Sequence, residues 1–305
     1  MRREREVDRD IRLKLAVQKS GRLTDPSLDL LARCGLKLSR GKDQLMGYGE
    51  NMPLDVLFVR DDDISDLVQE DVCDLGLVGL NVLEEKRLEL AARGATARFQ
   101  TVRTLEFGRC RLALAIPEGT RYGGAASLAG KRIATTYPFL LARFLRERDI
   151  RAEIVTLSGA VEIAPRLGRA DLICDLVSTG STLQANHLRE VETVLESCAV
   201  LIRTPLELNQ EKSEWVERLL MRIDGVQQVR ESKYIMLHAP RLALDEICRL
   251  LPGSESPTII PLEGHPDRVA VHAVCRENVF WETLEALKKA GASALLVLPV
   301  EKMLA

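Results

Sequence analysis

Short apolar runs alternate with amphipathic segments along the first two thirds of the chain. The run RLKLAVQ at 12–18 has the length and composition of a strand, and the segment from Thr24 to Gly35 carries an apolar side at helical spacing. Thr24 is the expected N-cap of this helix, and Gly35 is its expected C-terminal stop. The order of strand, loop and helix then repeats, which predicts α/β domains.

The repeats can be placed along the chain. Further strands are predicted at 53–60, 73–79, 109–117, 131–138, 151–158, 170–177 and 198–204. Helices are predicted at 61–70, 81–88, 139–149, 160–168 and 181–188. Pro165 interrupts the helix predicted at 160–168.

The pattern changes near residue 207. A long polar helix with one apolar stripe is predicted at 207–232, and we interpret it as a connecting helix. Beyond it we predict a strand at 233–240, a helix at 243–253, strands at 256–263 and 268–275, a helix at 279–291 and a strand at 292–300. This β-α-β-β-α-β order is that of a ferredoxin-like domain. Small domains of this kind often regulate an attached enzyme, although the order alone does not establish such a role.

Composition and charge argue against several classes of function. The 305 residues are enough for two or three domains, and 46% apolar with 29% charged residues is normal for a soluble globular protein. A net charge of −2 and an aromatic content of 4% argue against nucleic-acid binding. No apolar run approaches the ~18 residues of a membrane span, and the charged N-terminus lacks the apolar core of a signal peptide.

The cysteines and histidines indicate neither disulfides nor a metal site. The seven cysteines include no C-x-x-C pair, and most lie within or beside apolar runs. The four histidines are far apart, without the spacing of metal ligands. We therefore expect a cytoplasmic protein whose cysteines are reduced core thiols.

A cluster of hydroxyl side chains follows the predicted strand at 170–177, which contains Asp175. Four hydroxyl residues and one glycine make up this hydroxyl loop: Ser178, Thr179, Gly180, Ser181 and Thr182. Unpaired N–H groups and the helix dipole favour phosphate at a helix start, and the hydroxyls can donate to it as well. Asp175 can accept hydrogen bonds from sugar hydroxyls or attract hydrated Mg²⁺. Capping of the helix explains one hydroxyl but not the run of four, so we favour a phosphate site.

Two other predicted strand ends carry charged residues. Lys19 and Arg22 flank Gly21, and two cations beside a helix start suit an anion such as pyrophosphate. A solvated basic loop is the alternative explanation. Arg60 ends the strand at 53–60 and precedes three acids, of which Asp62 and Asp63 can serve only to stabilise the helix dipole.

Two glycines lie at the strand predicted at 73–79. Gly76 and Gly79 allow the backbone to approach a planar base closely. A close-packed sheet needs similar glycines, so packing is the alternative explanation.

The hydroxyl loop resembles the segment by which phosphoribosyltransferases hold the ribose 5-phosphate of 5-phosphoribosyl 1-pyrophosphate (PRPP), with one of its two acids missing. Other motifs follow in one order along nearly the whole chain: QKSGRL, LLARCG, ENMP, VRDDDI, DLGLVGLNVLEE, GKRIATTYP, GAVEIAPR, ICDLVSTGSTL, ESKYIMLHAP, PTIIPL and FWETLEALKKAGAS. Together they resemble the long form of ATP phosphoribosyltransferase, the first enzyme of histidine biosynthesis. Such a series is far more specific than any single motif.

The resemblance implies a fold class and a domain organisation. The family has two α/β domains like those of periplasmic binding proteins, with the active site in the cleft between them, and a C-terminal ferredoxin-like regulatory domain. In this chain the first domain corresponds to residues 1–107 and 185–228, of which 209–228 is the connecting helix. The second corresponds to residues 108–184, and the regulatory domain to residues 229–305.

The resemblance also implies a reaction and its ligands. The family's enzyme, a glycosyltransferase, joins N1 of ATP to C1 of PRPP in the presence of Mg²⁺ and releases pyrophosphate. Histidine is the expected feedback inhibitor, and AMP is a further candidate inhibitor. The expected assembly is a homo-oligomer built from dimers into hexamers. No metal ligand is assigned, because Mg²⁺ is expected to be held mainly by substrate phosphates.

Roles carried over from the family fall on particular residues of this chain. The expected catalytic cations are Lys19, Arg22 and Arg60. The expected PRPP-binding residues are Glu162, Asp175, Ser178, Thr179, Gly180, Ser181 and Thr182. The expected ATP-binding residues are Gly21, Asp74, Gly76, Gly79 and Tyr137. The expected histidine-binding residues are His238, Ser254, Thr258, Val274 and Ala294.

Some of these assignments have simpler explanations. Tyr137 can serve only in packing, Glu162 can cap a helix, and Val274 and Ala294 fit a core.

The chain also departs from the family pattern at one position. Gln44 stands where we expect an arginine, just before the Leu45-Met46 pair. Arg40 and Lys42 lie close by in sequence and are candidates to replace it.

Two rival functions fit parts of the same pattern. A non-catalytic ligand-binding protein of the solute-receptor type has the same two-lobed architecture. The expected lack of a signal peptide argues against it, as do two anion loops in different lobes. A phosphoribosyltransferase for another base is the second rival, and a histidine-sensing domain argues against it.

Overall fold

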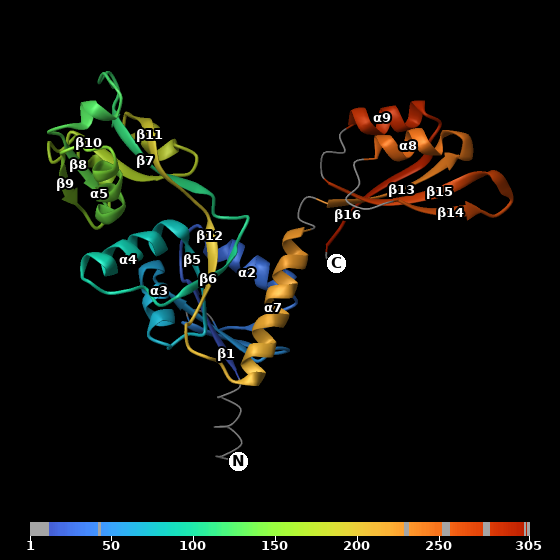
Figure 1. The fold of residues 1–305 in the computed structure, drawn as a ribbon, viewed down its shortest axis with the longest axis horizontal. Helices are drawn as coiled ribbons and strands as arrows, with labels where there is room; N and C mark the ends of the chain where they lie inside the picture. Colours follow the sequence, from blue (N-terminus) through green and yellow to red (C-terminus); the bar gives the residue numbers. More distant parts are fainter. Residues whose placement is uncertain are drawn as a thin grey trace, which may run out of the picture. The chain divides into compact units, whose positions relative to one another are not determined.

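The computed structural model describes residues 12–41, 44–228, 232–251, 257–276, 281–301 and 303. The chain divides into two compact units, residues 1–215 and 216–305 (Figure 1). Lys42 and Ser254, both named above, lie outside the described residues. No helix in the described ranges is long and apolar enough to cross a membrane.

A seven-stranded sheet lies in the first unit, with the strand order β2-β3-β4-β1-β5-β12-β6. The strands are β1 (Leu13–Gln18), β2 (Leu38–Ser39), β3 (Met46–Gly49), β4 (Leu54–Val59), β5 (Leu75–Gly79), β6 (Gln100–Thr104) and β12 (Ala199–Arg203). The helices of this part are α2 (Thr24–Arg33), α3 (Asp61–Gln69) and α4 (Leu80–Ala92). β1 pairs in parallel with β4 and β5, so the carboxyl ends of these three strands lie along one edge of the sheet.

Packing explains why the central strand is apolar almost throughout. Leu15, Ala16 and Val17 of β1 are fully buried, as expected for a parallel strand with helices on both faces. Ile64 and Val68 of α3 belong to the same buried cluster as Ala16. This packing holds the start of α3 directly after the end of β4.

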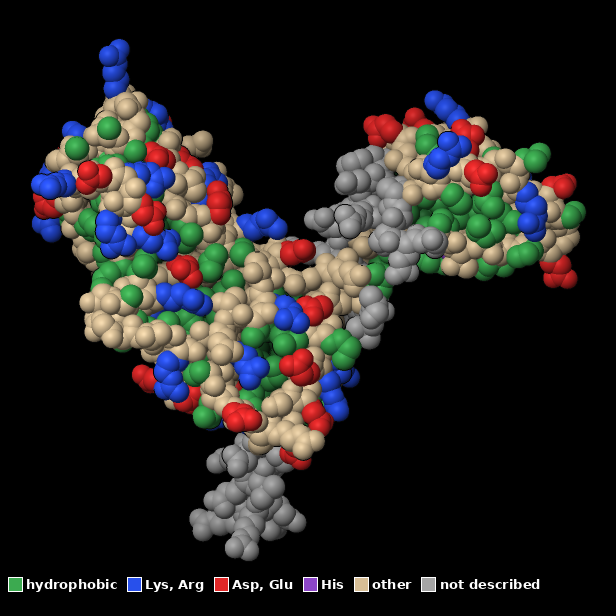
Figure 2. All heavy atoms as spheres, viewed as in Figure 1, with side chains coloured by type: hydrophobic (Ala, Val, Ile, Leu, Met, Phe, Trp, Pro, Cys, Tyr) green, Lys and Arg blue, Asp and Glu red, His purple; other side chains and the backbone are tan. Residues whose placement is uncertain are grey.

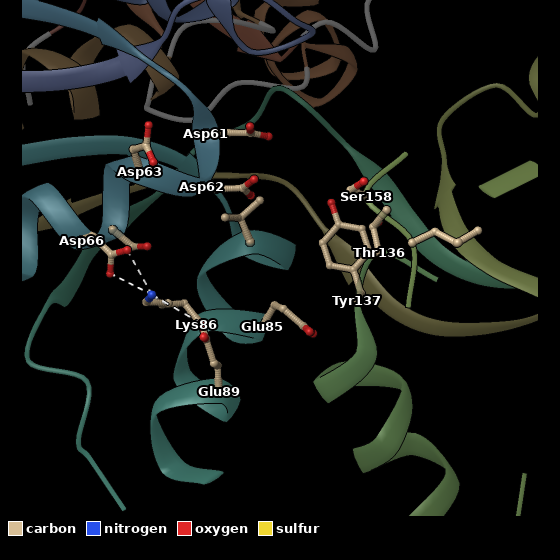
Figure 3. Close-up of a pocket in the computed structure, with 13 residues that line it drawn as sticks. Asp61, Asp62, Asp63, Asp66, Glu85, Lys86, Glu89, Thr136, Tyr137 and Ser158 are labelled. Atoms are coloured by element: carbon tan, nitrogen blue, oxygen red, sulfur yellow. Dashed lines mark hydrogen bonds and ion pairs between the residues drawn. The ribbon is translucent and has the colours of Figure 1, made fainter. Parts of the chain in front are cut away.

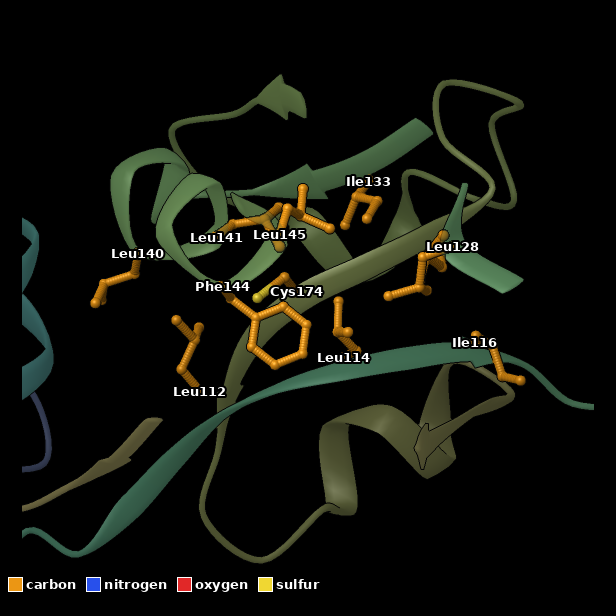
Figure 4. Close-up of a cluster of buried hydrophobic side chains, with 11 residues drawn as sticks. Leu112, Leu114, Ile116, Leu128, Ile133, Leu140, Leu141, Phe144, Leu145 and Cys174 are labelled. Atoms are coloured by element: carbon orange, nitrogen blue, oxygen red, sulfur yellow. The ribbon is translucent and has the colours of Figure 1, made fainter. Parts of the chain in front are cut away.

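A five-stranded sheet forms the other part of the first unit, with the order β11-β7-β10-β8-β9. The strands are β7 (Cys110–Pro117), β8 (Arg132–Thr135), β9 (Glu153–Thr156), β10 (Leu172–Val177) and β11 (Leu188–Ser197). The helical segments are η1 (Ala125–Leu128), α5 (Pro138–Glu147), η2 (Val161–Ile163) and α6 (Ser181–Ala185). Figure 4 shows the core beneath α5, where Phe144 of the helix packs with Leu112 and Leu114 of β7 in one buried cluster.

Four strands were not predicted from the sequence: β2, β3, β6 and β11. The longest of them, β11, has the sequence LREVETVLES, whose charged residues hide it from an apolar-run criterion. It pairs antiparallel with β7, so the second sheet includes residues beyond 184, the boundary expected above. The chain then returns to the first sheet through β12.

Three local predictions need correction. The helix α2 begins at Thr24 itself, with Leu23 in the N-cap position, and the Thr24 hydroxyl donates to the Gln18 carbonyl over 3.0 Å. The helix predicted at 160–168 is only the 3₁₀ turn η2, because Pro165 cannot continue a helix. The helix predicted at 181–188 ends at Ala185.

The second unit has the predicted β-α-β-β-α-β order and confirms the ferredoxin-like fold. The helix α7 (Gln210–Gln228) precedes it in the chain, and the unit contains β13 (Ser232–Pro240), η3 (Arg241–Ala243), α8 (Leu244–Leu250), β14 (Thr258–Leu262), β15 (His265–Arg276), α9 (Trp281–Lys289) and β16 (Ser293–Pro299). The antiparallel sheet has the order β14-β15-β13-β16. Ile247 of α8 and Leu287 of α9 pack with Leu237 of β13 on one face of this sheet.

The state of the cysteines and the distribution of charge also agree with what the sequence predicts. All seven cysteines are free, and five of them are buried, as expected for reduced core thiols. Figure 2 shows positive and negative side chains interspersed over the visible face of the first unit, in line with a net charge of only −2.

Candidate active site

The predicted cations lie at the carboxyl edge of the seven-stranded sheet. Lys19 and Arg22 follow β1, and Arg60 follows β4. The Lys19 backbone N–H donates to the Val59 carbonyl over 2.7 Å, which holds the loop after β1 beside Arg60. All three cations are exposed, and none forms a salt bridge with a residue that the structure describes.

Gly21 gives the loop after β1 its shape. Its φ of +133° is a conformation that favours glycine. An added Cβ would lie 2.8 Å from the side-chain amide of Gln18, whose Oε1 accepts a hydrogen bond from the Leu23 N–H over 3.0 Å. Glycine is therefore needed here to place the two cations at the start of α2.

A cavity of about 460 Å³ opens between the start of α3, the helix α4 and the segments that follow β8 and β9 (Figure 3). Its lining residues are Asp61, Asp62, Asp63, Ser65, Asp66, Val82, Glu85, Lys86, Glu89, Thr136, Tyr137, Leu157 and Ser158. Of the residues expected at the site, Tyr137 lines this cavity. Six of the lining residues are acidic, which the sequence analysis had noted only for the three at the start of α3.

Only some of these acids have partners. Lys86 Nζ lies 2.9 Å from Asp66 Oδ1 and 3.3 Å from Glu89 Oε2. Asp61, Asp62 and Asp63, by contrast, form no side-chain hydrogen bond or salt bridge with any described residue. Loss of solvent raises the pKa of Asp62, and the neighbouring acids of α3 raise it further.

Tyr137 is fixed by a buried polar network that sequence analysis did not find. Its hydroxyl accepts from Asn81 Nδ2 over 2.9 Å, and its backbone N–H donates to Thr135 Oγ1 over 2.9 Å. Asn81 Oδ1 in turn accepts from the Ser197 hydroxyl over 2.8 Å, and the Asn81 N–H donates to Ser197 Oγ over 3.0 Å. Asn81 lies in the quoted motif DLGLVGLNVLEE, but an asparagine in a first helical turn is easily taken for a capping residue.

Glu85 occupies the N-terminus of α5. Its two carboxylate oxygens accept from the N–H groups of Phe139 and Leu140, each over 2.8 Å. Burial raises the pKa of Glu85, and the two hydrogen bonds oppose that shift. These two N–H groups are therefore engaged by the protein's own carboxylate rather than offered to a phosphate.

Asp175 and Glu162 form a pair of acids at the end of β10. Asp175 is half-buried, and one of its oxygens accepts from the Leu176 N–H over 2.8 Å. Burial raises the pKa of Asp175, and repulsion from Glu162 raises it further. Another segment of the chain thus places a second carboxylate, that of Glu162, near Asp175.

The hydroxyl loop is open to solvent. Ser178, Thr179, Ser181 and Thr182 are exposed, and Gly180 adopts a φ of +83°. Gly180, which has no side chain, is the N-cap of α6, and among the four hydroxyls only Thr179 Oγ1 accepts from an N–H of the described helix start, that of Ser181 over 3.5 Å. Thr179 and Ser181 hydroxyls lie 3.1 Å apart. The capping explanation therefore does not account for the run of hydroxyls.

Tyr137 lies between the cavity and the acid pair. Burial raises the pKa of its hydroxyl most, the Asn81 hydrogen bond opposes this, and Asp61 and Asp175 both raise it further. Carboxylates from the cavity and from β10 thus act on one phenol. The structure brings Tyr137, Asp175 and Glu162 into one region.

Asp74 and Gly76 do not join this region. Asp74 precedes β5, at the opposite end of the strand from Gly79, and its carboxylate accepts from the Lys14 N–H over 2.7 Å. Lys212 Nζ lies 2.9 Å from Asp74 Oδ1. These contacts give Asp74 a structural role, and its role in ATP binding stays a prediction.

The glycines of β5 differ in their surroundings. A Cβ on Gly76 would lie 2.7 Å from Ile64 Cγ2, so Gly76 serves the packing of α3 on the sheet. Gly79 is the N-cap of α4, and a Cβ there would lie 2.6 Å from Asn81 Oδ1. Gly79 thus remains at the edge of the candidate site, whereas Gly76 lies in the core.

Arg40 is engaged elsewhere. Its guanidinium lies 3.5 Å from the centre of the Phe58 ring, and its Nε donates to the Gln44 carbonyl over 2.9 Å. The Gln44 side chain accepts from the Gly41 N–H over 3.1 Å. Arg40 therefore packs on the sheet in this structure.

Four of the expected histidine-binding residues belong to the sheet of the second unit. Strand alternation and register place His238, Thr258 and Val274 on the sheet face turned away from α8 and α9. Ala294 adopts a φ of +50° at the start of β16, where the pairing with β13 shifts next to His238.

Comparison with known proteins shows which family this chain matches. Residues 60–225 match the family model described as ATP phosphoribosyltransferase, and residues 230–302 match the model for the C-terminal domain of the same family. Among solved structures, the chain is similar to the ATP phosphoribosyl transferase (HisG:HisZ) complex from Thermotoga maritima. That match has 26% identity and a TM-score of 0.56, and covers 70% of this chain and 98% of that chain.

A second likeness is weaker. The alkanesulfonate-binding protein SsuA from Xanthomonas axonopodis pv. citri is 17% identical, with a TM-score of 0.45, and the match covers 71% of this chain and 74% of that one. A TM-score this low carries no argument about this chain.

Proposed function

The chain belongs to the ATP phosphoribosyltransferase family, and on that premise we propose how its residues join N1 of ATP to C1 of PRPP with release of pyrophosphate. The protein is a phosphoribosyltransferase of histidine biosynthesis. One observation carries the residue assignments: the matched segment 60–225 contains the hydroxyl loop, the acid pair and the cavity, and Tyr137 lies among them. The non-catalytic binding protein is not favoured.

PRPP is assigned to the end of β10. Asp175 and Glu162 accept hydrogen bonds from the ribose hydroxyls, and the hydroxyl loop donates to the 5-phosphate through its N–H groups and side chains. The exposure of the four hydroxyls supports this role, because they have few partners within the protein.

The departing pyrophosphate is assigned to Lys19, Arg22 and Arg60. Negative charge grows on the pyrophosphate as its bond to C1 breaks, and fixed cations that stabilise this charge accelerate the step. Three exposed cations along one sheet edge, without salt bridges to described residues, support this assignment.

ATP is assigned to the region of Gly21, Gly79 and Tyr137. Adenine N1 has its own lone pair, so catalysis depends mainly on holding N1 within about 3–3.5 Å of C1 and in line with the leaving group. We propose no covalent intermediate with the protein.

Magnesium is proposed to arrive with the substrates. Within the described residues, no group of three or more His, Cys, Asp and Glu side chains has an arrangement that suits a metal ion. The side chains that the structure describes therefore do not fit a resident Mg²⁺ site, and no step is derived through one.

The second unit is proposed to sense histidine. His238, Thr258, Val274 and Ala294 supply a mixed polar and apolar surface on the sheet face turned away from the helices, and AMP is a further candidate inhibitor. The same face carries Ile260, Leu296 and Leu298, each about half exposed, which suits burial against another subunit. We propose a cytoplasmic homo-oligomer, from dimer to hexamer, and the complex from T. maritima supports assembly in the family.

The function is tested by incubating the protein with ATP, PRPP and Mg²⁺ and following phosphoribosyl-ATP and pyrophosphate by chromatography. We expect both products in equal amounts, and little product from Asp175→Asn at low PRPP. Parallel incubations with other purine and pyrimidine bases in place of ATP test the rival enzyme. Binding of either substrate without turnover would instead favour the non-catalytic protein.

A further inference from the structure

The acid-lined cavity has no role in the assignments above beyond Tyr137. Lys86 neutralises Asp66 and Glu89, and Glu85 is held by the N–H groups of α5. Three acids are left over, Asp61, Asp62 and Asp63. Figure 3 shows Asp61 and Asp62 extending from the start of α3 toward Tyr137. Among the described residues, neither has a hydrogen-bond or salt-bridge partner for its carboxylate, so this side of the cavity suits a positively charged group.

A second observation points to a ligand in the same cavity. Ser65 lines it and is fully buried, yet its hydroxyl has no hydrogen-bond partner among the described residues. A buried hydroxyl without a partner costs free energy, so such groups usually have one in the functional state. A ligand with polar atoms that enters the cavity can supply that partner.

The size and position of the cavity suit a nucleotide base. A volume of about 460 Å³ lies in the range of small-molecule sites. Tyr137 lies on the wall, and carboxylates from both the cavity and β10 act on its hydroxyl. Tyr137 thus borders both the cavity and the proposed PRPP site, so a ring in the cavity and the PRPP ribose can meet beside this side chain.

The reaction itself creates a positive charge on adenine. The lone pair of N1 forms the new bond to C1, and the electron pair of the C1–O bond leaves with pyrophosphate. The purine then carries one positive charge, shared between N1 and the N6 amino group, until N6 loses a proton. Carboxylates beside N6 stabilise this charge as it develops, because attraction between opposite charges is strong where solvent is partly excluded.

We propose that this cavity receives the adenine ring of ATP, with Asp62 as the carboxylate that accepts a hydrogen bond from N6 and stabilises the purine cation, and with Asp61 in support. The N6 proton leaves through Asp62 to solvent. This inference rests on the proposed function. The raised pKa of Asp62 suits the role, since a stronger base accepts the N6 proton more readily.

The test compares two nucleotides that differ in purine charge. N1-methyl-ATP carries a positive charge on its purine near neutral pH, whereas ATP does not. Calorimetry without PRPP and Mg²⁺ gives the dissociation constant of each for wild type, Asp62→Asn and Asp61→Asn. Glu70→Gln is the matched control, because it removes one negative charge at the exposed end of the same helix.

We expect wild type and Glu70→Gln to bind N1-methyl-ATP more tightly than ATP. In Asp62→Asn this preference should fall by roughly fivefold or more, while the affinity for ATP itself changes by no more than about twofold. Asp61→Asn should give a smaller loss of the same kind. A purely structural role for Asp62 would lower both affinities together.

An unchanged preference in a folded Asp62→Asn protein would overturn the proposal, as would a wild type without any preference. Mn²⁺ binding by the nucleotide-free protein that disappears in Asp62→Asn would also overturn it, and would assign the cavity to a metal ion. Product formation by the wild type separates this inference from the proposed function. Turnover with an unchanged preference would contradict only this inference, whereas a lack of turnover would contradict the proposed function.

Discussion

Single residues at the site depend on neighbours from distant segments. Asp175 belongs to β10, and the carboxylate that raises its pKa in addition to burial comes from Glu162. Asp74, which carries the same chemical group, sits at the far end of β5 in a salt bridge with Lys212. We therefore propose that the same chemical group serves binding at Asp175 and stability at Asp74, two roles that mutation can separate.

Glu162→Gln should lower the pKa of Asp175, because it removes a like charge. PRPP binding requires Asp175 in its ionised form, so it weakens as the pH falls through this pKa. In the variant that loss should move to lower pH, although the affinity near neutral pH also drops if Glu162 itself contacts the ribose. Calorimetric titrations of PRPP between pH 4 and 8 measure the shift. Identical pH profiles for variant and wild type would show that the two acids are not coupled.

Asp74→Ala should reduce stability without affecting ATP binding. It leaves Lys212, whose side chain is only 16% exposed, without its carboxylate, and removes the acceptor for the Lys14 N–H. Breaking such a pair costs about 2–4 kcal/mol of unfolding free energy, less than for a fully buried pair. Urea denaturation measures this, and Asp25→Ala on the surface of α2 is the control. Weaker ATP binding with unchanged stability would instead support the expected role of Asp74 in ATP binding.

At the scale of elements, the start of each helix determines whether its N–H groups are available to a ligand. The N–H groups at the start of α5 are taken by Glu85, whereas the loops before α2 and α6 leave their polar groups exposed. The strand β11 likewise depends on its surroundings. Its charged sequence has little local strand preference, and pairing with β7 makes it a strand.

Glu85→Ala should loosen the start of α5. It removes one acceptor for two backbone N–H groups, and the loss of a cap costs about 1–2 kcal/mol. Hydrogen exchange should speed up at Phe139 and Leu140 before it does elsewhere in α5. Glu84→Ala is the control on the same helix, because Glu84 pairs only with the side chains of Arg87 and Arg143. Equal exchange rates in both variants would contradict the capping role.

At the scale of the whole molecule, the candidate active site and the expected histidine-binding residues lie in different units. The first unit contains both sheets and the candidate active site, and the second contains the expected histidine-binding residues. We propose that the second α/β domain extends to Ser197, since β11 pairs within its sheet. The remaining domain limits stay as predicted from the sequence.

Ending the chain after residue 228 should abolish histidine binding and preserve PRPP binding. The truncated chain keeps the whole first unit, and the T. maritima chain is matched over 98% of its length by 70% of this chain. Circular dichroism establishes that the product is folded, and calorimetry with histidine and PRPP gives the two affinities. A folded truncated protein that still binds histidine would place the sensor in the first unit.

The sequence by itself determined most of the fold and the family. Apolar runs and amphipathic helices are local patterns, so β1, β4, β5 and the β-α-β-β-α-β order of the second unit were predicted close to their observed limits. The ordered series of motifs identified the family, and the strand-end loops identified Asp175, Lys19 and Arg22 as candidates. Gln18, Leu23 and the geometry of Gly21 then agree with a loop that places two cations at a helix start.

Only the tertiary structure decided which of these residues meet. The Tyr137 hydroxyl has its partner Asn81 on α4, and Asn81 in turn is held by Ser197 at the end of β11. Glu85 reaches α5 from α4. Contacts between segments so far apart in sequence leave no periodic pattern in the sequence, because they depend on the tertiary packing of the first unit. The same holds for Asp74. The sequence does not reveal its salt bridge with Lys212, which the structure forms at the end of β5 opposite Gly79. Local sequence propensity determines which helices and strands form. Long-range packing determines which of them are adjacent, and the candidate site is built from side chains of adjacent elements.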